Sequence, residues 1–140
     1  MVMDTDDTGI PHAPAGVVTL KSPFGFEETL ARIAAAIAAK GLTLFADIDH
    51  SGAAASVGLT MRPAHVLIFG SPRAGTPLMV AAPLLALELP LKALVWQDTA
   101  GLTQVSYTSP AYLAHRYTVP DNLTINIAGI EPLLAGALQQ

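Results

Sequence analysis

The sequence contains no cysteine, and that absence excludes several kinds of chemistry. Disulfide bonds, thiolate nucleophiles and zinc–thiolate sites all depend on the cysteine side chain. A chain without cysteine is compatible with a reducing compartment, so we expect a cytoplasmic protein.

Long uninterrupted apolar runs are also missing. The most apolar window, residues 79–96, contains residues that would break or charge a membrane helix, namely Pro83, Glu88, Pro90 and Lys92.

Charged residues are scarce as well. They make up 13% of the 140 residues, about half of the usual quarter. Apolar residues make up 51% of the chain, and this balance predicts an additional buried surface, for which a homodimer is the simplest source. The net charge of −4 and the scattered basic residues argue against nucleic acid or an anionic membrane as partner.

The pattern of apolar residues predicts one α+β domain over residues 16–140, after a flexible tail at residues 1–15. The tail is acidic and polar, so we expect no targeting segment there. Alternation and helical spacing give the order β-α-β-(short α)-β-α-β-β-α-α, which favours a mostly antiparallel sheet covered by helices. The expected strands are 16–22, 42–48, a central strand around 66–69, 91–97 and 102–107. The expected helices are 26–40, 53–57, 76–89, 110–117 and 121–140, with Pro83 and Pro132 as interruptions.

The stretch 64–90 organises this pattern as a buried strand, a Gly/Pro loop and a helix. We expect Thr76 to be the N-cap of that helix and Pro77 its first residue. The glycines of the loop at residues 70–75 have the spacing of a nucleotide phosphate loop, but Thr76 occupies the position of the lysine. A weaker anion site, formed by the helix N-terminus and Arg73, is a second interpretation. A tight turn with a positive φ at Gly75 is the third, and the sequence favours it.

Asp47, Asp49 and His50 form the one local cluster of carboxylates and imidazole in the sequence. On a strand, Asp47 and Asp49 share a face, and His50 comes after them at a Ser-Gly turn. His50 and Asp49 are therefore candidate metal ligands, and His50 is a candidate general base. The alternative, which we favour, is that His50 pins the turn while Asp49 caps the short helix.

Tyr112, His115 and Arg116 lie three and four residues apart, so one face of a short helix presents all three. They could close one side of a polar pocket, with Arg116 binding a carboxylate or a phosphate. A solvated helix face is the plainer interpretation. His65 precedes an apolar strand and is expected to be a buried or edge histidine rather than a ligand.

Several short motifs resemble the bacterial and archaeal domain-of-unknown-function family 302. In chain order they are Ile48-Asp49-His50, Ile68-Phe69-Gly70, Gly75-Thr76-Pro77-Leu78-Met79, Leu89-Pro90-Leu91-Lys92 and Tyr112-Leu113-Ala114, within residues 17–117. The resemblance implies a single α+β domain of the TATA-binding-protein-like class and a homodimer, and it implies no established activity. The chain departs from the family pattern at Ala64, Ser71 and Tyr117, where threonine, asparagine and histidine are usual.

The function predicted from the sequence is that of a small dimeric domain which binds a small anionic or amphipathic ligand. Its pocket is expected at the strand ends, with His50, the segment 70–76, Tyr112 and Arg116 around it. An enzyme that uses a His/Asp site, with or without a metal, is one alternative. A structural or protein-interaction module is the other, and the sequence identifies no cofactor.

Overall fold

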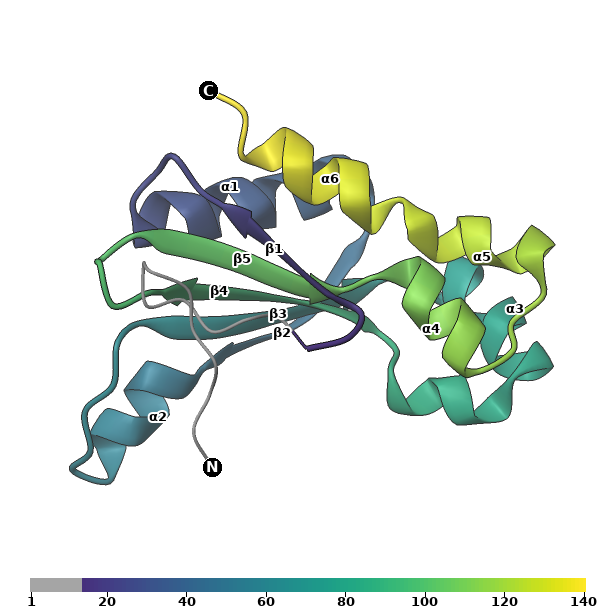
Figure 1. Cartoon of the computed structure of the whole chain (residues 1–140), viewed down its shortest axis with the longest axis horizontal. Helices are drawn as coiled ribbons and strands as arrows, with labels where there is room; N and C mark the ends of the chain where they lie inside the picture. Colours follow the sequence, from purple (N-terminus) through teal and green to yellow (C-terminus); the bar gives the residue numbers. More distant parts are fainter. Residues whose placement is uncertain (1–13) are drawn as a thin grey trace.

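The computed structural model describes residues 14–140, in which helices accompany one five-stranded sheet (Figure 1). The predicted α+β class and element order are confirmed, with one additional 3-10 helix, η1. Of the predicted tail, residues 1–13 lie outside the described residues. The strands are β1 (Val17–Lys21), β2 (Thr43–Asp49), β3 (Ala64–Gly70), β4 (Leu91–Gln97) and β5 (Thr103–Thr108). The helices are α1 (Phe26–Ala39), α2 (His50–Ser56), α3 (Pro72–Ala81), η1 (Pro83–Leu87), α4 (Pro110–Arg116), α5 (Asp121–Ala128) and α6 (Ile130–Ala137).

The strand order in the sheet is β1-β5-β4-β3-β2, and all four neighbouring pairs are antiparallel. β1 and β2 are therefore the two edge strands, and α1 connects them across the sheet. β4 and β5 form an antiparallel hairpin, whose turn ends in Gly101 with a positive φ of 82°. Within residues 14–140, every helix is too short or too polar to span a bilayer.

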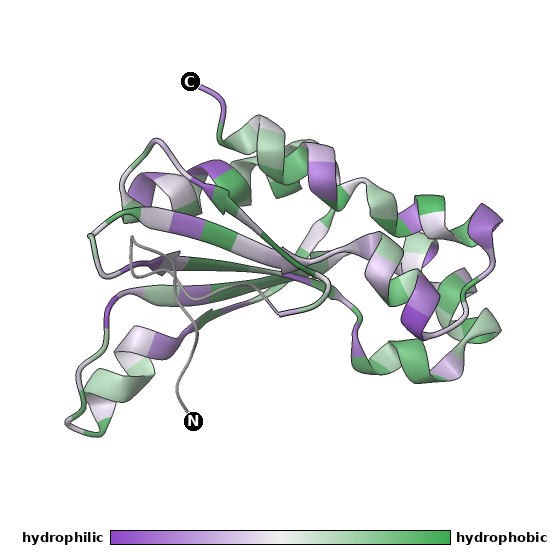
Figure 2. Ribbon diagram, viewed as in Figure 1, coloured by the Kyte–Doolittle hydropathy of each residue, from purple (hydrophilic) through white to green (hydrophobic). Residues whose placement is uncertain are grey.

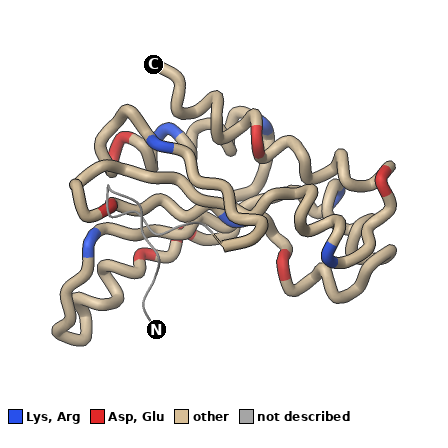
Figure 3. Tube along the Cα trace, in the orientation of Figure 1, with Lys and Arg blue, Asp and Glu red and all other residues tan. Residues whose placement is uncertain are grey.

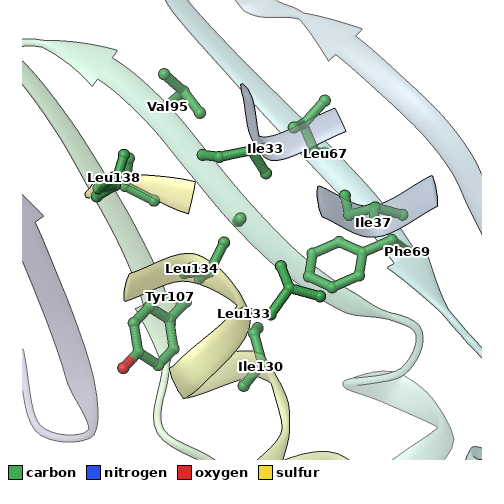
Figure 4. Packing of buried hydrophobic residues seen from close by; sticks show 12 residues of the cluster. Ile33, Ile37, Leu67, Phe69, Val95, Tyr107, Ile130, Leu133, Leu134 and Leu138 are labelled. Carbon is green, nitrogen blue, oxygen red and sulfur yellow. The ribbon is translucent and has the colours of Figure 1, made fainter. Parts of the chain in front are cut away.

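α1 and α6 cover one face of the sheet, and the main core lies between these layers (Figure 4). Ile33 and Ile37 of α1 are 0% and 1% exposed, because the helical spacing places both on the side that faces the strands. Side chains that alternate along the strands meet them, among them Leu67 and Phe69 of β3. Burying each such side chain contributes about 1.5–3 kcal/mol. The core therefore fixes both the face of the sheet and the position of α6.

Tyr107 of β5 adds a polar contact to the edge of this core. Its hydroxyl donates to Glu131 Oε2 of α6 over 2.8 Å. Burial, together with this hydrogen bond and the nearby carboxylate, raises the pKa of Tyr107 to about 12. The phenol therefore remains a neutral hydrogen-bond donor throughout the physiological range and ties α6 to the sheet.

The opposite face of the sheet carries apolar side chains that are only partly buried. Strand alternation places Val66 and Ile68 of β3 beside Leu94 and Trp96 of β4 on this face. The Trp96 indole donates to Ser106 Oγ over 2.9 Å. The two faces of the sheet thus differ, since the helix-covered face contains the fully buried residues.

A second apolar cluster lies beyond the end of the sheet at which β3 finishes and β4 begins. It joins α3, η1, α4 and α5, which form the right-hand part of Figure 1. Figure 2 colours most of η1 green, in keeping with its sequence PLLAL. The buried members of this cluster are Leu78, Ala82, Leu85, Leu113, Val119 and Ile127.

The start of α3 differs from the prediction. The N-cap is Ser71, whose hydroxyl accepts from the backbone N–H of Ala74, and Pro72 rather than Pro77 opens the helix. Ser71-Pro72 is as good a cap and first-turn pair as Thr76-Pro77, and it comes earlier in the chain. The prediction of a loop over 70–75 with a positive φ at Gly75 is therefore wrong, because Gly75 lies inside the helix.

Other helix boundaries agree better with the sequence. α3 ends at Ala81, and Pro83 opens η1, as the proline predicted. Asp49 caps α2, which starts at His50, slightly earlier than expected. The C-terminal helix is interrupted as predicted, but the break lies at Gly129, so that Pro132 falls in the first turn of α6.

Candidate functional site

A cavity of about 510 Å³ opens at the end of the sheet where β3 finishes and β4 begins. α3 forms one wall, and the junction of α5 and α6 forms another. Most of its surface comes from apolar side chains and glycines. The lining residues are Lys40, Leu42, Phe45, Phe69, Gly70, Ser71, Pro72, Ala74, Gly75, Thr76, Met79, Leu89, Pro90, Leu91, Asn126, Ile127, Gly129, Ile130, Pro132 and Leu133.

Gly75 lies inside α3 and faces the segment before β4. It is buried, and a Cβ added at this position would meet Leu89 Cδ1 at 3.5 Å, which is ordinary contact. Met79 lies one helical turn further along and also lines the cavity. Residues 75 and 79 therefore lie on the same face of α3, and this face forms the apolar wall.

Phe45 reaches the cavity because β2 contains a bulge. Leu44 pairs with Phe69 and Ala46 pairs with Ile68, so Phe45 is an extra residue opposite the regular ladder of β3. A bulge of this kind changes the direction of a side chain. Phe45 is 50% exposed and also lines the cavity, which places an aromatic ring at its opening.

The polar groups of the lining are few. Ser71 uses its hydroxyl as the cap of α3, and Asn126 donates through Nδ2 to the carbonyl oxygen of Ala74 over 3.0 Å. Thr76, which the sequence suggested as a ligand-binding residue, also lines the cavity. Among the described lining residues, Lys40 is the only one with a charged side chain. The cavity therefore combines apolar walls with one cationic group.

The N-terminus of α3 offers little to an anion. Pro72 has no backbone N–H, and the N–H groups of Ala74 and Gly75 both donate to the carbonyl oxygen of Ser71, over 3.0 and 2.8 Å. Arg73 is exposed and is not among the residues that line the cavity. The structure thus separates Arg73 from the cavity that Thr76 borders.

His50 lies at the other end of the sheet. β2 and β3 are antiparallel, so Thr43 pairs with Gly70 at the cavity end while Asp49 pairs with His65 at the far end. His50 comes directly after Asp49 and is exposed as the first residue of α2. The expectation that His50 and the segment 70–76 share one pocket is therefore wrong, because the length of the strands lies between them.

His65 is the histidine that meets the carboxylates, and the sequence interpretation missed this role. Its Nδ1 lies 2.7 Å from Asp47 Oδ1, and its Nε2 lies 3.2 Å from Asp49 Oδ1. The ring of Phe26 packs edge-on against the imidazole, with 5.5 Å between ring centroids. The shared face of Asp47 and Asp49 was a usable signal, because a residue of the neighbouring antiparallel strand had to face them.

Asp49 is held by donors from its own turn. The backbone N–H of Gly52 and the hydroxyl of Ser51 each donate to Asp49 Oδ1 over 2.7 Å. These bonds, the first above all, lower the pKa of Asp49 below its ordinary value, and the nearby His65 acts in the same direction. Within residues 14–140, no three His, Asp or Glu side chains are grouped so that they could hold a metal ion.

Tyr112, His115 and Arg116 are exposed on α4, away from the cavity lining. Arg116 Nη1 lies 3.8 Å from Glu88 Oε1, and the same carboxylate accepts from the Tyr117 hydroxyl over 2.8 Å. That hydrogen bond raises the pKa of Tyr117. Tyr112 packs on Gly16, where a Cβ would overlap its ring. The structure thus keeps these three residues together but does not bring them to the cavity.

Sequence comparison identifies a family and a group of curated relatives. The family Domain of unknown function DUF302 matches residues 18–140. Proteins named fluoride-specific ion channel FluC 1, from Brucella suis biovar 1 (strain 1330) and Brucella abortus biovar 1 (strain 9-941), are each 36% identical over 105 residues, which is 75% of this chain. The match covers 41% and 39% of those proteins. The chain therefore spans about two fifths of the length of the curated relatives it matches.

Structure comparison identifies the same fold in a crystal structure of an uncharacterised conserved DUF302 protein from Bacillus stearothermophilus. The TM-score is 0.74, over 89% of this chain and 97% of that chain. The sequences are 22% identical, so this likeness concerns the fold alone.

Proposed function

Because this chain belongs to the family Domain of unknown function DUF302, whose name supplies no activity, we propose that it is a binding domain for a small amphipathic molecule. The observation that carries the proposal is the cavity of about 510 Å³ at the ends of β3 and β4. Small-molecule sites are typically concave and mostly apolar, with volumes of roughly 300–1,000 Å³ and a few placed polar groups. The cavity has this size and this chemistry.

An amphipathic ligand fits the walls better than a small anion does. The curated relatives are named for fluoride, and the sequence suggested an anion site at the N-terminus of the helix that follows β3. A strongly hydrated anion needs several donors to replace its water. The N–H groups of Ala74 and Gly75 already donate to Ser71, and most of the remaining wall is carbon. Burial of apolar ligand surface is therefore the main attraction that the cavity offers.

Catalysis by a histidine–carboxylate site has less support. His65, rather than His50, is the histidine beside Asp47 and Asp49, and both of its ring nitrogens face carboxylate oxygens. A general base needs a free nitrogen within reach of its substrate. This arrangement favours a structural role for the cluster over an enzymatic one.

We also propose that the domain works as a homodimer. Figure 3 shows few charged residues, spread over a largely uncharged trace. After α2 the chain exposes a run of apolar side chains, Val57, Leu59 and Met61, which are 71%, 65% and 46% exposed. Exposed apolar surface of this kind is typical of an interface. Sedimentation at micromolar concentration should show a dimer, and a 14.5 kDa monomer alone would contradict it.

Binding in the cavity can be tested with an amphipathic fluorescent probe, 1-anilinonaphthalene-8-sulfonate, and two variants of α3. Thr76 is exposed and borders the cavity, so Thr76→Trp should obstruct it without disturbing the core. Val80→Trp is the matched control, because Val80 is 77% exposed on the same helix and lies outside the lining.

We expect Thr76→Trp to weaken binding of the probe by roughly tenfold, equivalent to about 1.4 kcal/mol. Val80→Trp should leave the affinity unchanged. Equal affinity in both variants would place the probe outside the cavity and contradict the proposal. Native mass spectrometry of the freshly purified protein supplies an independent measurement, since a bound natural ligand would add a fixed mass.

A further inference from the structure

We propose that the ligand is an aliphatic carboxylate, with its chain in the cavity and its carboxylate beside the ammonium group of Lys40. The inference rests on the proposed function, because it assigns the chemical class of the molecule that the cavity binds. The observation behind it is that the cavity lining has a positive charge and no negative charge to balance it. One cationic side chain borders a large apolar space, and none of the described lining residues is acidic.

The backbone fixes Lys40 at the edge of the cavity. It is the C-cap of α1, and its N–H donates to the carbonyl oxygen of Ala36. Gly41 then takes a positive φ of 69° and turns the chain toward Leu42, which lines the cavity too. The ammonium group is carried on a flexible four-carbon stem, so it can reach a carboxylate at the mouth while its base stays in place.

Lys40 is also free of the carboxylates around it. The ion pairs within residues 14–140 join His65 to Asp47 and Asp49, and Arg116 to Glu88; Lys40 takes part in none of them. The other cations that the sequence suggested lie elsewhere, because Arg73 is outside the lining and Arg116 faces Glu88. Among the described residues, no carboxylate lies within ion-pair distance of Lys40.

The rest of the lining suits a hydrocarbon chain rather than a second polar group. Met79, Leu89, Ile130 and Leu133 supply flexible or branched apolar surface from three different segments. Phe45, half exposed at the bulge, adds an aromatic ring to this apolar lining. The opening thus pairs a cation with an aromatic ring, as expected for a molecule with a charged end and an apolar body.

Isothermal titration calorimetry with octanoate, hexanoate, octan-1-ol and acetate measures how much the head group and the chain each contribute to the affinity. Octanoate should bind the wild-type protein more tightly than acetate, and lengthening the chain from hexanoate to octanoate should raise the affinity by roughly fourfold per methylene. Lys40→Gln should weaken octanoate by about fivefold, the upper value for an exposed ion pair. It should leave octan-1-ol unchanged, because the alcohol has no charge to lose.

Two further variants keep the result interpretable. Lys40→Arg preserves the positive charge and should retain octanoate binding. Lys92→Gln is the matched control, since Lys92 is an exposed lysine of β4 outside the lining. Melting temperatures of all variants should agree with that of the wild type.

The outcomes distinguish this inference from the function on which it rests. If octanoate and octan-1-ol bind with similar affinity and Lys40→Gln changes neither, the carboxylate assignment is overturned while binding in the cavity stands. If neither octanoate nor octan-1-ol binds at millimolar concentration, and 1-anilinonaphthalene-8-sulfonate is insensitive to Thr76→Trp, the proposed function itself fails.

Discussion

The two ends of the β2–β3 pair have opposite chemistry. At the end marked by Thr43 and Gly70, helices close around an apolar cavity. At the end marked by Asp49 and His65, two carboxylates hold an imidazole, and α2 projects from the sheet without a buried residue (Figure 1). The same two strands therefore serve an enclosed apolar site and an exposed polar cluster.

The difference arises from the helix that each strand leads into. β3 leads into α3, whose apolar residues join the cluster with α4 and α5. β2 leads into α2, a seven-residue helix of His, Ser, Gly and Ala that has little apolar surface to bury. An element buries a face only if it has large apolar side chains to place there. The composition of these two helices thus decides which end becomes enclosed.

The largest effect is expected at the cavity end. Phe69 is 0% exposed in the main core, and Phe69→Ala should lower the free energy of unfolding by about 3–5 kcal/mol. Ile48→Ala at the opposite end is the control, because Ile48 is 41% exposed and should cost far less. Chemical denaturation measures both. Similar losses in the two variants would mean that the ends do not differ in burial.

A smaller effect distinguishes two histidines at the polar end. His65→Gln removes the imidazole between Asp47 and Asp49 and should lower the free energy of unfolding by about 1 kcal/mol, since both carboxylates are partly solvated. His50→Gln should change it by less than about 0.5 kcal/mol, because His50 is exposed. Thermal or urea denaturation at pH 6 measures both changes. A larger loss of stability for His50→Gln than for His65→Gln would mean that His50 is the structural residue.

Gly75→Ala should stabilise the protein. Gly75 lies inside α3, and a Cβ there would make ordinary contact with Leu89 at 3.5 Å. Replacing glycine by alanine within a helix gains about 0.5–1 kcal/mol when the added methyl group fits. A higher melting temperature is the expected result. A clear loss of stability would restore the tight-turn interpretation of this segment.

The smallest effect concerns pH at the polar end. The pKa of Asp49 is lower in the folded protein than its ordinary value of 3.8. Its stabilising contribution is therefore present above pH 3.8 and is lost as the pH falls through the folded-state pKa. Asp49→Asn should flatten the decline in stability between pH 5 and pH 2. Asp121→Asn, at the start of α5, is the control and should leave the slope steeper than Asp49→Asn does.

Local patterns predicted most of the fold. Three features depend on residues close together in the sequence, so they can be predicted from it directly. They are the apolar stripe that includes Ile33 and Ile37, the glycine that follows Lys40, and the hairpin turn at Gly101. The start of α3 was misplaced because two Ser/Thr-Pro pairs compete within one short segment. Local preference alone does not distinguish the two pairs, and the structure uses Ser71-Pro72.

The candidate site was less accessible to prediction. A cavity does lie at the strand ends, with Thr76 in its lining, but the residues that the sequence suggested for one pocket lie at both ends of the sheet. Strand pairing separates His50 from Gly70, and no local pattern encodes that pairing. Lys40 was missed as a lining residue, because the position of a helix end relative to a cavity depends on residues that are distant in the sequence.

The bulge at Phe45 also affects how copies of this chain meet. β2 is an edge strand, and an edge with a regular row of free backbone groups is a template for sheet growth by another molecule. The extra residue breaks that row, while Asp47 and Asp49 place negative charge along the same strand. β2 is therefore a poor template for fibril-like stacking, and this safeguard matters in a chain that carries so little charge elsewhere.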